Sequence, residues 1–238
     1  MKYDVSLILA CYNETEIFND SVKRIIRVMD ATDYTYEIIF VDDKSLDNTR
    51  QLINKALLKY PNHNLSAYFH DKNYGRGQTV IDGFKKAQGK IVGFIDIDLE
   101  VGEWYLPKFI SAIEVGSDVV TGWRIYDFNL HSFIRWIGSK GYFCLQKKLL
   151  RLPLHDTEAG YKFFNKAKTI PILKKCQHQD WFFDTEVLAR AFEAKLKIQE
   201  IPVAFVRNRD KTSTVKLIPD TIKYLKNLIS FSLQYKHE

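Results

Sequence analysis

The chain has 238 residues, of which 46% are apolar and 27% charged, which is enough for one large domain with a substantial core, with or without an appendage. Lys and Arg outnumber Asp and Glu by 35 to 29, and the net charge of +6 favours anionic partners such as nucleotides, lipid phosphates or nucleic acid, although a solvated basic surface explains it equally well. The three cysteines have no CxxC spacing, which argues against a disulfide framework. The N-terminus runs directly into a strand pattern, which argues against a signal peptide. No apolar stretch approaches the roughly 20 residues of a membrane span, which argues against a transmembrane helix. We therefore expect a protein of a reducing compartment that is soluble or lies on a membrane surface.

In the first half of the chain, short apolar runs alternate with segments of helical periodicity. The apolar runs predict strands at 5–10, 36–41, 64–69 and 89–95. The periodic segments predict helices at 15–31, from Asp47 or Asn48 to about residue 60, and at 77–87. Repeated strand–helix units are typical of a mostly parallel sheet with helices on both faces and right-handed crossovers.

Polar clusters follow three of these strands at the point where each strand ends. The clusters are Tyr12–Glu14, Asp42–Ser45 and Asp96–Asp98. Because ligands bind beyond the carboxyl ends of parallel strands, we expect the three clusters to meet at one edge of the sheet. Asp96 and Asp98 leave a buried strand one residue apart, which favours a divalent cation that also holds a phosphate, although such a pair also occurs as a plain polar strand end.

The second half of the chain is less regular. Residues 117–121 and 202–206 predict strands, and Gly122-Trp123-Arg124 follows the first of them. Residues 128–152 predict one or two amphipathic helices with interspersed Lys and Arg, which either pack on the core or lie against a bilayer. A helical pattern covers 184–191, and a basic amphipathic segment covers 216–236.

Seven short motifs follow one another along almost the whole chain. They are Val5–Glu14, Glu37–Thr49, Asn73–Gly77, Asp96–Glu100, Gly122–Arg124, Asp156–Phe164 and Trp181–Glu186. Together they resemble the motifs of the family-2 glycosyltransferases, which have the GT-A fold. The last two are close to segments of the branch that glycosylates polyprenyl phosphates, including dolichol-phosphate mannose synthases and dolichyl-phosphate glucosyltransferases. Each motif is moderately specific, whereas seven in the family's order are a strong signal.

The chain also departs from the family pattern. Ala10-Cys11 replaces Pro-Val, Lys44 replaces Gly, Arg76 replaces Lys, and Glu100 stands where the mannose enzymes often have Gln. Arg76 keeps the charge of lysine but changes its geometry. The late Gly-x-Ser-Lys segment is poorly kept at 207–214. Roles carried over to Lys44 and to residues 207–214 are therefore the least secure.

The resemblance implies an α/β fold of the GT-A (Rossmann-like) type, with a mostly parallel central sheet and helices on both faces. It implies a catalytic domain at 1–206 and a basic amphipathic C-terminal segment at 207–238 near a membrane. The implied reaction moves a hexose, with inversion, from UDP-glucose or GDP-mannose to dolichyl or undecaprenyl phosphate, and it uses Mg²⁺ or Mn²⁺. The implied metal ligands are Asp96, Asp98 and Glu100. Asp98 is the direct ligand, Asp96 shares the metal or touches the ribose, and Glu100 is a ligand, orients a metal-bound water or is merely solvated.

The nucleotide sugar would be held at the end of the first strands. The residues implied for this role are Ala10, Tyr12, Glu14, Asp42, Arg76, Gly77 and Asp96. Glu14 is alternatively an acid at a helix N-terminus, and Asp43 is as consistent with a helix cap or loop role as with binding.

A phosphate acceptor is already largely dianionic at neutral pH and needs cations rather than a general base. The implied acceptor-phosphate residues are Arg124, Arg135, Lys162, Arg207 and Arg209, with Arg124 first, and the implied catalytic residues are Asp98, Arg124 and Asp184. If the acceptor is instead a glycan or another hydroxyl, Asp184 is the candidate base; otherwise it caps a helix.

Three further hypotheses concern class, partners and location. The main alternative from another functional class is a nucleotide-binding module without catalysis. Nucleic-acid binding is suggested by the net charge alone, so we expect no nucleic-acid partner. Related enzymes often continue into transmembrane helices, and this sequence shows none. Three explanations are possible: an enzyme type without transmembrane helices, a longer chain of which this is a part, or a small subunit that anchors the protein to the membrane. We expect a peripheral protein at the cytoplasmic face of a membrane.

Overall fold

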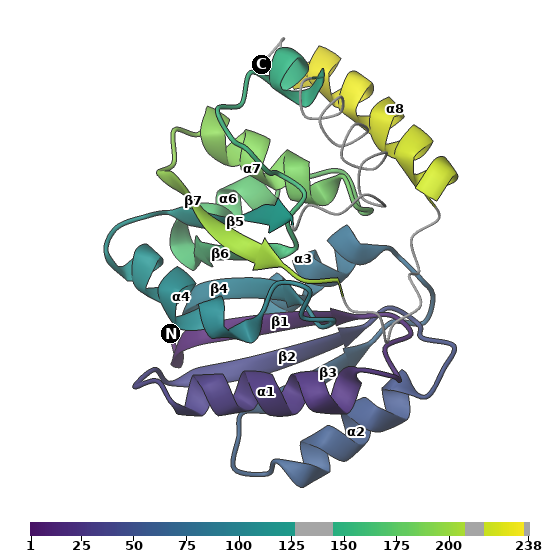
Figure 1. The fold of residues 1–238 in the computed structure, drawn as a ribbon, viewed down its shortest axis with the longest axis vertical. Coiled ribbons are helices and arrows are strands. Elements are labelled where there is room, and N and C mark those ends of the chain that lie inside the picture. Colours follow the sequence, from purple (N-terminus) through teal and green to yellow (C-terminus); the bar gives the residue numbers. More distant parts are fainter. Residues whose placement is uncertain (127–144, 208–216, 236–238) are drawn as a thin grey trace.

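The computed structural model describes residues 1–126, 145–207 and 217–235, and in the last range it describes side chains from residue 221 onward. The strands of the described chain form one seven-stranded sheet with the order β3-β2-β1-β4-β6-β5-β7 (Figure 1). The strands are β1 Tyr3–Cys11, β2 Tyr36–Asp42, β3 Leu65–Phe69, β4 Gly89–Asp96, β5 Val119–Tyr126, β6 Tyr161–Asn165 and β7 Ile198–Phe205. The helices are α1 Phe18–Asp30, α2 Thr49–Lys59, α3 Arg76–Lys86, α4 Leu106–Glu114, α6 Lys166–Leu173, α7 Phe183–Glu193 and α8 Leu217–Tyr235, with a short 3₁₀ turn, η1, at Glu103–Tyr105.

The predicted mostly parallel sheet is confirmed. β1 pairs in parallel with both β2 and β4, β2 with β3, and β5 with β7. Strand β6 is the exception, because it runs antiparallel to β4 and to β5. The sequence analysis predicted neither β6 nor α4 nor α6. It predicted that β5 begins at residue 117 and β7 at residue 202, whereas they begin at residues 119 and 198.

Helices cover both faces of the sheet, as predicted (Figure 1). Apolar side chains of α1, α2 and α4 pack on one face, where Phe18, Ile53 and Phe109 belong to a single core cluster. Side chains of α3, α6, α7 and α8 form the second cluster on the other face. Each helix buries its apolar stripe against the sheet, which is the arrangement that the helical periodicity requires.

The sheet register brings the predicted polar clusters together. Cys11 lies opposite Asp42 on one side of β1, and Ala10 lies opposite Asp96 on the other side. With strands spaced about 4.8 Å apart, the backbones of Asp42 and Asp96 are therefore about 10 Å apart across the end of β1. The expectation that these carboxylates share one edge of the sheet is met.

Strand β6 begins where β4 ends, because the two strands are antiparallel. Tyr161 pairs with Ile95, and Asp96 N donates to Gly160 O at 3.0 Å. The segment before β6 is thereby delivered to the same edge as the carboxylates of β4.

Two of the sequence-based predictions lie wholly or partly outside the described residues. Of the predicted helices at 128–152, residues 145–150 are helical and the part up to 144 is not described. Among the described residues, Cys11 and Cys176 form no disulfide, and Cys144 lies outside the described ranges. Among the helices that the structure describes, none combines the length and apolarity needed to cross a bilayer.

Helix α7 is the most buried helix of the described fold, and its carboxylate Glu186 is fully buried. Glu186 accepts hydrogen bonds from the backbone of Gln177 and His178, from His178 Nδ1 at 2.8 Å and from Arg190 Nε at 3.0 Å. Burial alone would raise the pKa of Glu186, but the bonds from His178 and Arg190 outweigh it and lower the pKa below the ordinary 4.5.

Replacing Glu186 with Gln should therefore lower the free energy of unfolding at neutral pH by about 2–4 kcal/mol, since four donors lose a charged acceptor. The contribution of a carboxylate with a lowered pKa is complete above pH 4.5 and is lost as the pH falls through the folded-state pKa. Urea denaturation of both proteins from neutral pH to the onset of acid unfolding should show their difference shrinking. Glu16→Gln, at an exposed position, is the matched control. A difference that stays constant with pH would contradict this account.

Candidate active site

The loops after β1 and β2 are tied to each other. Asn13 N donates to Ser45 Oγ at 3.0 Å, and Leu46 N donates to Asn13 Oδ1 at 2.8 Å. Asn13 and Lys44 adopt left-handed backbone conformations, with φ of 59° and 65°. Glycine adopts this conformation at the lowest cost, so the loop keeps a glycine-type geometry although lysine occupies the position.

The predicted nucleotide-sugar residues of the first motif lie beside this loop. Ala10 and Tyr12 are half-buried, and Glu14 is buried. The Glu14 carbonyl accepts from Phe18 N at the start of α1, and Glu14 N donates to Thr49 Oγ1 at 2.7 Å. The backbone of Glu14 thus joins the starts of α1 and α2, and its role in nucleotide binding stays a prediction.

The two aspartates at the end of β2 have different environments. Asp42 is buried, and within the described chain its carboxylate accepts from a single donor, Ser45 N, which lies 3.4 Å from each carboxylate oxygen. Asp43 instead accepts from Tyr74 N and Gly75 N, both at 2.8 Å, and lies 2.8 Å from His70 Nδ1. Asp43 therefore fixes the loop before α3, whereas Asp42 keeps capacity for a further donor.

Helix α3 begins at this loop and directs Arg76 inward. Gly75 has φ of 96°, a conformation that glycine favours, and a Cβ there would meet the backbone of Gln179. A Cβ on Gly77 would meet Phe183 and the backbone of Asp180. Both glycines therefore permit close packing of α3 against the segment before α7. Whether Gly77 also contacts a nucleotide sugar stays a prediction.

Arg76 belongs to a buried ion network of two cations and two carboxylates. Its Nη2 lies 2.6 Å from Asp96 Oδ1, and its Nη1 donates to Asp184. The other oxygen of Asp184 lies 3.0 Å from Lys162 Nζ, which also donates to the Ala159 carbonyl. The side chains of Lys162 and Asp184 are 0% and 2% exposed, respectively. The network links α3, β4, β6 and α7.

Burial and neighbouring carboxylates shift the pKa values of the two cations, Lys162 and Arg76. Burial lowers the pKa of Lys162 and opposes charging of Arg76, and the nearby carboxylates work in the opposite direction. For Lys162 the net pKa is lowered, whereas for Arg76 the Asp184 and Asp96 carboxylates outweigh burial and raise it. The Arg76 guanidinium lies 5.3 Å from the ring centroids of both Phe94 and Trp181, so two aromatic faces hold it in place.

Gly160 is required by this network. A Cβ at residue 160 would overlap Asp96 Oδ2 and approach Arg76 Nη2 to 2.6 Å. The close approach of β6 to the end of β4 thus depends on glycine at this position.

The Asp96–Glu100 loop suits a divalent cation by chemistry. Leu99 has a φ of 52°, and Glu100 N lies 3.3 Å from Asp98 Oδ1, so the loop turns sharply at the sheet edge. Among the described residues, no group of three or more His, Cys, Asp or Glu side chains could hold a metal ion alone. Mg²⁺ is commonly held by one or two carboxylates with phosphate oxygens and water completing the shell, and this donor set fits that pattern.

A second ion pair, between Arg124 and Asp156, lies at the end of β5. Arg124 Nε lies 2.7 Å from Asp156 Oδ2 and its Nη2 lies 3.0 Å from Asp156 Oδ1, a bidentate pair. Glu158 Oε2 lies 3.6 Å from Arg124 Nη2. Burial raises the pKa of Asp156, but Arg124 outweighs it and lowers the pKa. For Glu158, burial and the neighbouring Asp156 raise the pKa in spite of Arg124.

The structure brings together Asp96, Arg76, Lys162 and Asp184, and it places Arg124 at the same edge of the sheet. Lys162 faces the buried network, so its predicted contact with an acceptor phosphate stays a prediction. Arg207 is exposed after β7, and Arg135 and Arg209 lie outside the described residues. The sequence reasoning gave no role to Asp156, Glu158, Gly160 or Trp181. All four belong to the last two motifs, which was the signal that could have identified them.

The order of the strands and the carboxylates at the edge of the sheet agree with the GT-A fold. The sequence model of glycosyl transferase family 2 matches residues 6–172, and the chain belongs to this family. This confirms the family and the enzyme class that the seven motifs predicted.

Curated relatives include two proteins that align with nearly the whole chain. The glycosyltransferase AglD of Haloferax volcanii is 26% identical over 92% of this chain, and the dolichyl-phosphate beta-glucosyltransferase of Saccharomyces cerevisiae is 28% identical over 97% of it. An undecaprenyl-phosphate 4-deoxy-4-formamido-L-arabinose transferase of Edwardsiella ictaluri is 31% identical over 49% of the chain. The chain spans 35%, 75% and 35% of the lengths of these three relatives, respectively.

Solved structures support the fold. Glucosyl-3-phosphoglycerate synthase from Mycobacterium tuberculosis, in complex with Mn²⁺, UDP and glucosyl-3-phosphoglycerate, superposes with a TM-score of 0.70 over 98% of this chain and 80% of its own, at 15% identity. The same enzyme was also solved with Mg²⁺ and UDP, with a TM-score of 0.69. At this level of identity the likeness establishes the fold alone.

The ion network yields a prediction about stability. Asp184→Asn should lower the free energy of unfolding by about 3–5 kcal/mol, because Arg76 and Lys162 would stay buried with one carboxylate fewer. The double variant Asp184→Asn/Lys162→Met removes one charge of each sign and should be less destabilised than Asp184→Asn alone. Urea denaturation of the wild type, Asp184→Asn, Lys162→Met and the double variant tests this. If the double variant proves as unstable as the sum of the single variants, Lys162 and Asp184 are not coupled.

Proposed function

We propose that the protein transfers a hexose from a nucleotide-diphosphate sugar to a polyprenyl phosphate, with inversion and with Mg²⁺ or Mn²⁺. The main support is the position of Asp184. A hydroxyl acceptor would need a base, and the predicted base is buried with both of its oxygens bonded to cations. A phosphate acceptor needs no base, because its nucleophilic oxygen is already ionised. The names of two relatives, a dolichyl-phosphate and an undecaprenyl-phosphate transferase, agree with this choice.

On the donor side, the buried Asp42 would accept a hydrogen bond from the base or ribose, since in the described chain the single donor to its carboxylate, Ser45 N, is as far as 3.4 Å away. Asp98 and Asp96, with Glu100 as a third oxygen donor, would hold the metal. When bound, the metal stabilises charge on the departing diphosphate. Arg76 is bonded to both Asp96 and Asp184, and its charge would help to offset that of the same phosphates. UDP-glucose and GDP-mannose are the donors proposed.

On the acceptor side, Arg124 would orient the lipid phosphate. Its Nε and Nη2 are used by Asp156 and Glu158, and among the described residues no hydrogen bond is recorded for its Nη1. Asp156 thus holds the guanidinium by two of its five N–H groups, a third lies near Glu158, and the two on Nη1 are left for a phosphate oxygen. Attack by that oxygen opposite the leaving diphosphate inverts the anomeric carbon.

A glycan or other hydroxyl acceptor is the second candidate, and Glu158 favours it. Its side chain is partly exposed beside Arg124, and its raised pKa is typical of a residue that accepts a proton in catalysis. Under this alternative Glu158→Gln should abolish transfer to a hydroxyl acceptor. Under the proposed reaction the same variant should keep transfer to a prenyl phosphate.

The metal-dependent transfer predicts the behaviour of Asp98→Asn. With a panel of nucleotide sugars, Mg²⁺ or Mn²⁺ and a short prenyl phosphate, the wild type should form the glycolipid, detected by mass. Asp98→Asn should lower kcat/KM at least about a hundredfold because the leaving diphosphate loses its metal. EDTA should have a similar effect on the wild type.

Two comparisons make this test specific. Asp20→Asn, an exposed position on α1, controls for the loss of a carboxylate, and the unfolding transition of Asp98→Asn should match that of the wild type. A folded wild type that transfers no sugar to any prenyl phosphate would refute the proposed reaction. Unchanged transfer by Asp98→Asn would refute the assignment of the metal site.

Residues 207–238 are proposed to place the catalytic domain, 1–206, at the cytoplasmic face of a membrane, with or without a small anchoring subunit. Helix α8 exposes Ile222, Ile229 and Leu233, while Leu228 and Phe231 pack on the core. Lys223 and Lys226 are exposed near this apolar stripe. A stripe of apolar residues beside lysines is typical of helices that lie in the interface of an anionic bilayer.

Vesicle binding tests the role of α8. The protein should sediment with vesicles that contain anionic lipid, and Ile229→Asp or Leu233→Asp should weaken binding about tenfold each, since an exposed apolar side chain no longer enters the lipid. Leu58→Asp on α2, at an apolar position that is even more exposed, should bind as the wild type does. Equal binding of all four proteins would show that α8 is not the membrane-facing surface.

A further inference from the structure

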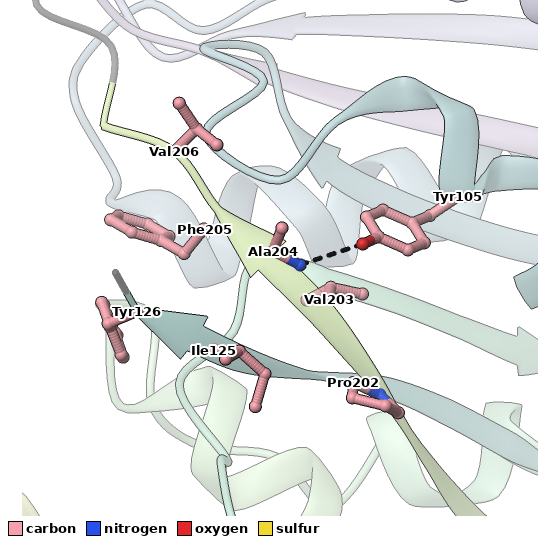
Figure 2. A pocket seen from close by; sticks show the side chains of 8 residues that line it. All are labelled: Tyr105, Ile125, Tyr126, Pro202, Val203, Ala204, Phe205 and Val206. Carbon is pink, nitrogen blue, oxygen red and sulfur yellow. Dashed lines mark hydrogen bonds between the residues drawn. The ribbon is translucent and has the colours of Figure 1, made fainter. Parts of the chain in front are cut away.

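An apolar groove lies at the carboxyl ends of β5 and β7. Its volume is about 290 Å³, and Figure 2 shows the side chains that surround it. They are Tyr105, Ile125, Tyr126, Pro202, Val203, Ala204, Phe205 and Val206. Two tyrosine hydroxyls are the only polar side-chain groups in this lining.

The apolar lining is largely open to solvent instead of being part of the core. Ile125 is 47% exposed, Tyr126 is also 47% exposed, and Val206 is 61% exposed. The parallel register pairs Ile125 with Ala204 and Tyr126 with Phe205, so both strands contribute to the floor. Because successive side chains of a strand point to opposite faces, Tyr126 and Phe205 contribute from the sheet face that carries Arg124, and Ile125 and Ala204 from the other face. Exposed apolar residues that gather in one hollow are typical of a binding site, whereas single ones are common on any surface.

The connection that carries the Asp96–Glu100 loop adjoins the groove. Val206 N donates to Glu100 O at 2.8 Å, and Val101 forms an antiparallel bridge with Phe205. Tyr105 follows in the same connection, and its hydroxyl accepts a hydrogen bond from Ala204 N at 3.0 Å (Figure 2). The groove therefore begins immediately beside the Asp96–Glu100 loop of the candidate active site.

The acceptor-side arginine adjoins the groove as well. The Arg124 guanidinium lies 5.7 Å from the ring centroid of Tyr126 and 5.9 Å from that of Phe205, and these two rings are 4.9 Å apart. Both rings also belong to the groove lining. Arg124, whose Nη1 makes no hydrogen bond to the described residues, and the apolar groove thus share the side chains of Tyr126 and Phe205.

We propose that this groove binds the first isoprene units of the acceptor lipid, with the lipid phosphate on Arg124. The inference rests on the proposed function and extends it to a site for the chain. An amphiphile with a phosphate at one end needs a cation and an apolar surface next to each other, and Arg124 with Tyr126 and Phe205 provides both. The nucleotide sugar is proposed to lie at the ends of β1 and β2, which are separated from β5 and β7 by β4 and β6, so the groove is left for the acceptor. The volume lies at the lower end of ligand pockets, so the groove holds the start of the chain and not its full length.

The expected energetic effect is measurable. Each methylene removed from water strengthens binding about fourfold, so losing a few contacts should weaken a short prenyl phosphate about tenfold or more. Ile125→Asn makes the floor polar, and Ala204→Phe fills the groove. Both positions are exposed, so these substitutions should leave the unfolding transition close to that of the wild type.

The experiment measures binding of geranyl phosphate and of methyl phosphate by calorimetry, together with transfer kinetics. For Ile125→Asn and Ala204→Phe, the Kd and KM for geranyl phosphate should rise about tenfold, while the weak binding of methyl phosphate and the KM for the donor stay unchanged. Val115→Asn, at an exposed apolar position after α4, is the matched control and should behave as the wild type.

The two failures are distinguishable. If the wild type binds geranyl phosphate in a groove-dependent manner but transfers no sugar, the groove assignment stands and the proposed reaction falls. If both groove variants bind and use geranyl phosphate as the wild type does, the groove assignment is wrong and the proposed reaction is unaffected. A change in sedimentation mass or melting temperature in both variants, with unchanged binding of geranyl phosphate, shows that protein covers the groove and also overturns the assignment.

Discussion

The contact of Asp184 with two cations is the constraint on which the candidate site depends. Asp184 lies on α7, Lys162 on β6 and Arg76 on α3, and Arg76 extends the contact to Asp96 on β4. A buried charge without its partner costs several kcal/mol, so these four elements pack only in an arrangement that keeps the ions together. The same contact positions Arg76 at the donor edge and keeps Asp184 away from solvent. One buried interaction therefore both shapes the donor site and argues against a hydroxyl acceptor.

The antiparallel strand β6 explains how donor and acceptor residues meet. In a purely parallel sheet, the segment before a strand lies at the edge opposite the carboxyl ends. Because β6 runs against β4, the segment that contains Asp156 and Glu158 reaches the edge where Asp96 lies. The loop after Asp98 then closes the outer edge of β7, so the metal loop and the acceptor groove are built from one connection. An edge strand covered in this way is also protected from pairing with other chains.

Local sequence patterns were sufficient for the first half of the fold and for its carboxylate edge. Strands β2 and β4 are apolar runs that end in aspartate, β1 is an apolar run that is followed by Tyr12–Glu14, and parallel pairing brings such ends together. Helix α4 was missed although Leu106, Phe109, Ile110 and Ile113 have helical spacing, and α6 contains Pro171, which disfavours a helix interior. The partners of Lys162 could not be predicted, because they come from β6 pairing and α7 packing over long sequence separations. A lysine inside the apolar run 161–164 nevertheless signals a buried ion pair.

The described part of the site has more carboxylates than cations, although the proposed substrates are both phosphates. Each of the three cations, Arg76, Arg124 and Lys162, is already bonded to at least one carboxylate. A pyrophosphate brought to this edge would therefore meet net negative charge, and repulsion in a partly buried site is only weakly screened by salt. A divalent cation on Asp96 and Asp98 reverses the local sign at the place where the diphosphate would lie. Under the proposed function, this charge distribution would make the metal necessary for donor binding as well as for the departure of the diphosphate. The carboxylates that create this surplus are Asp42, Asp96, Asp98, Glu100, Asp156, Glu158 and Asp184.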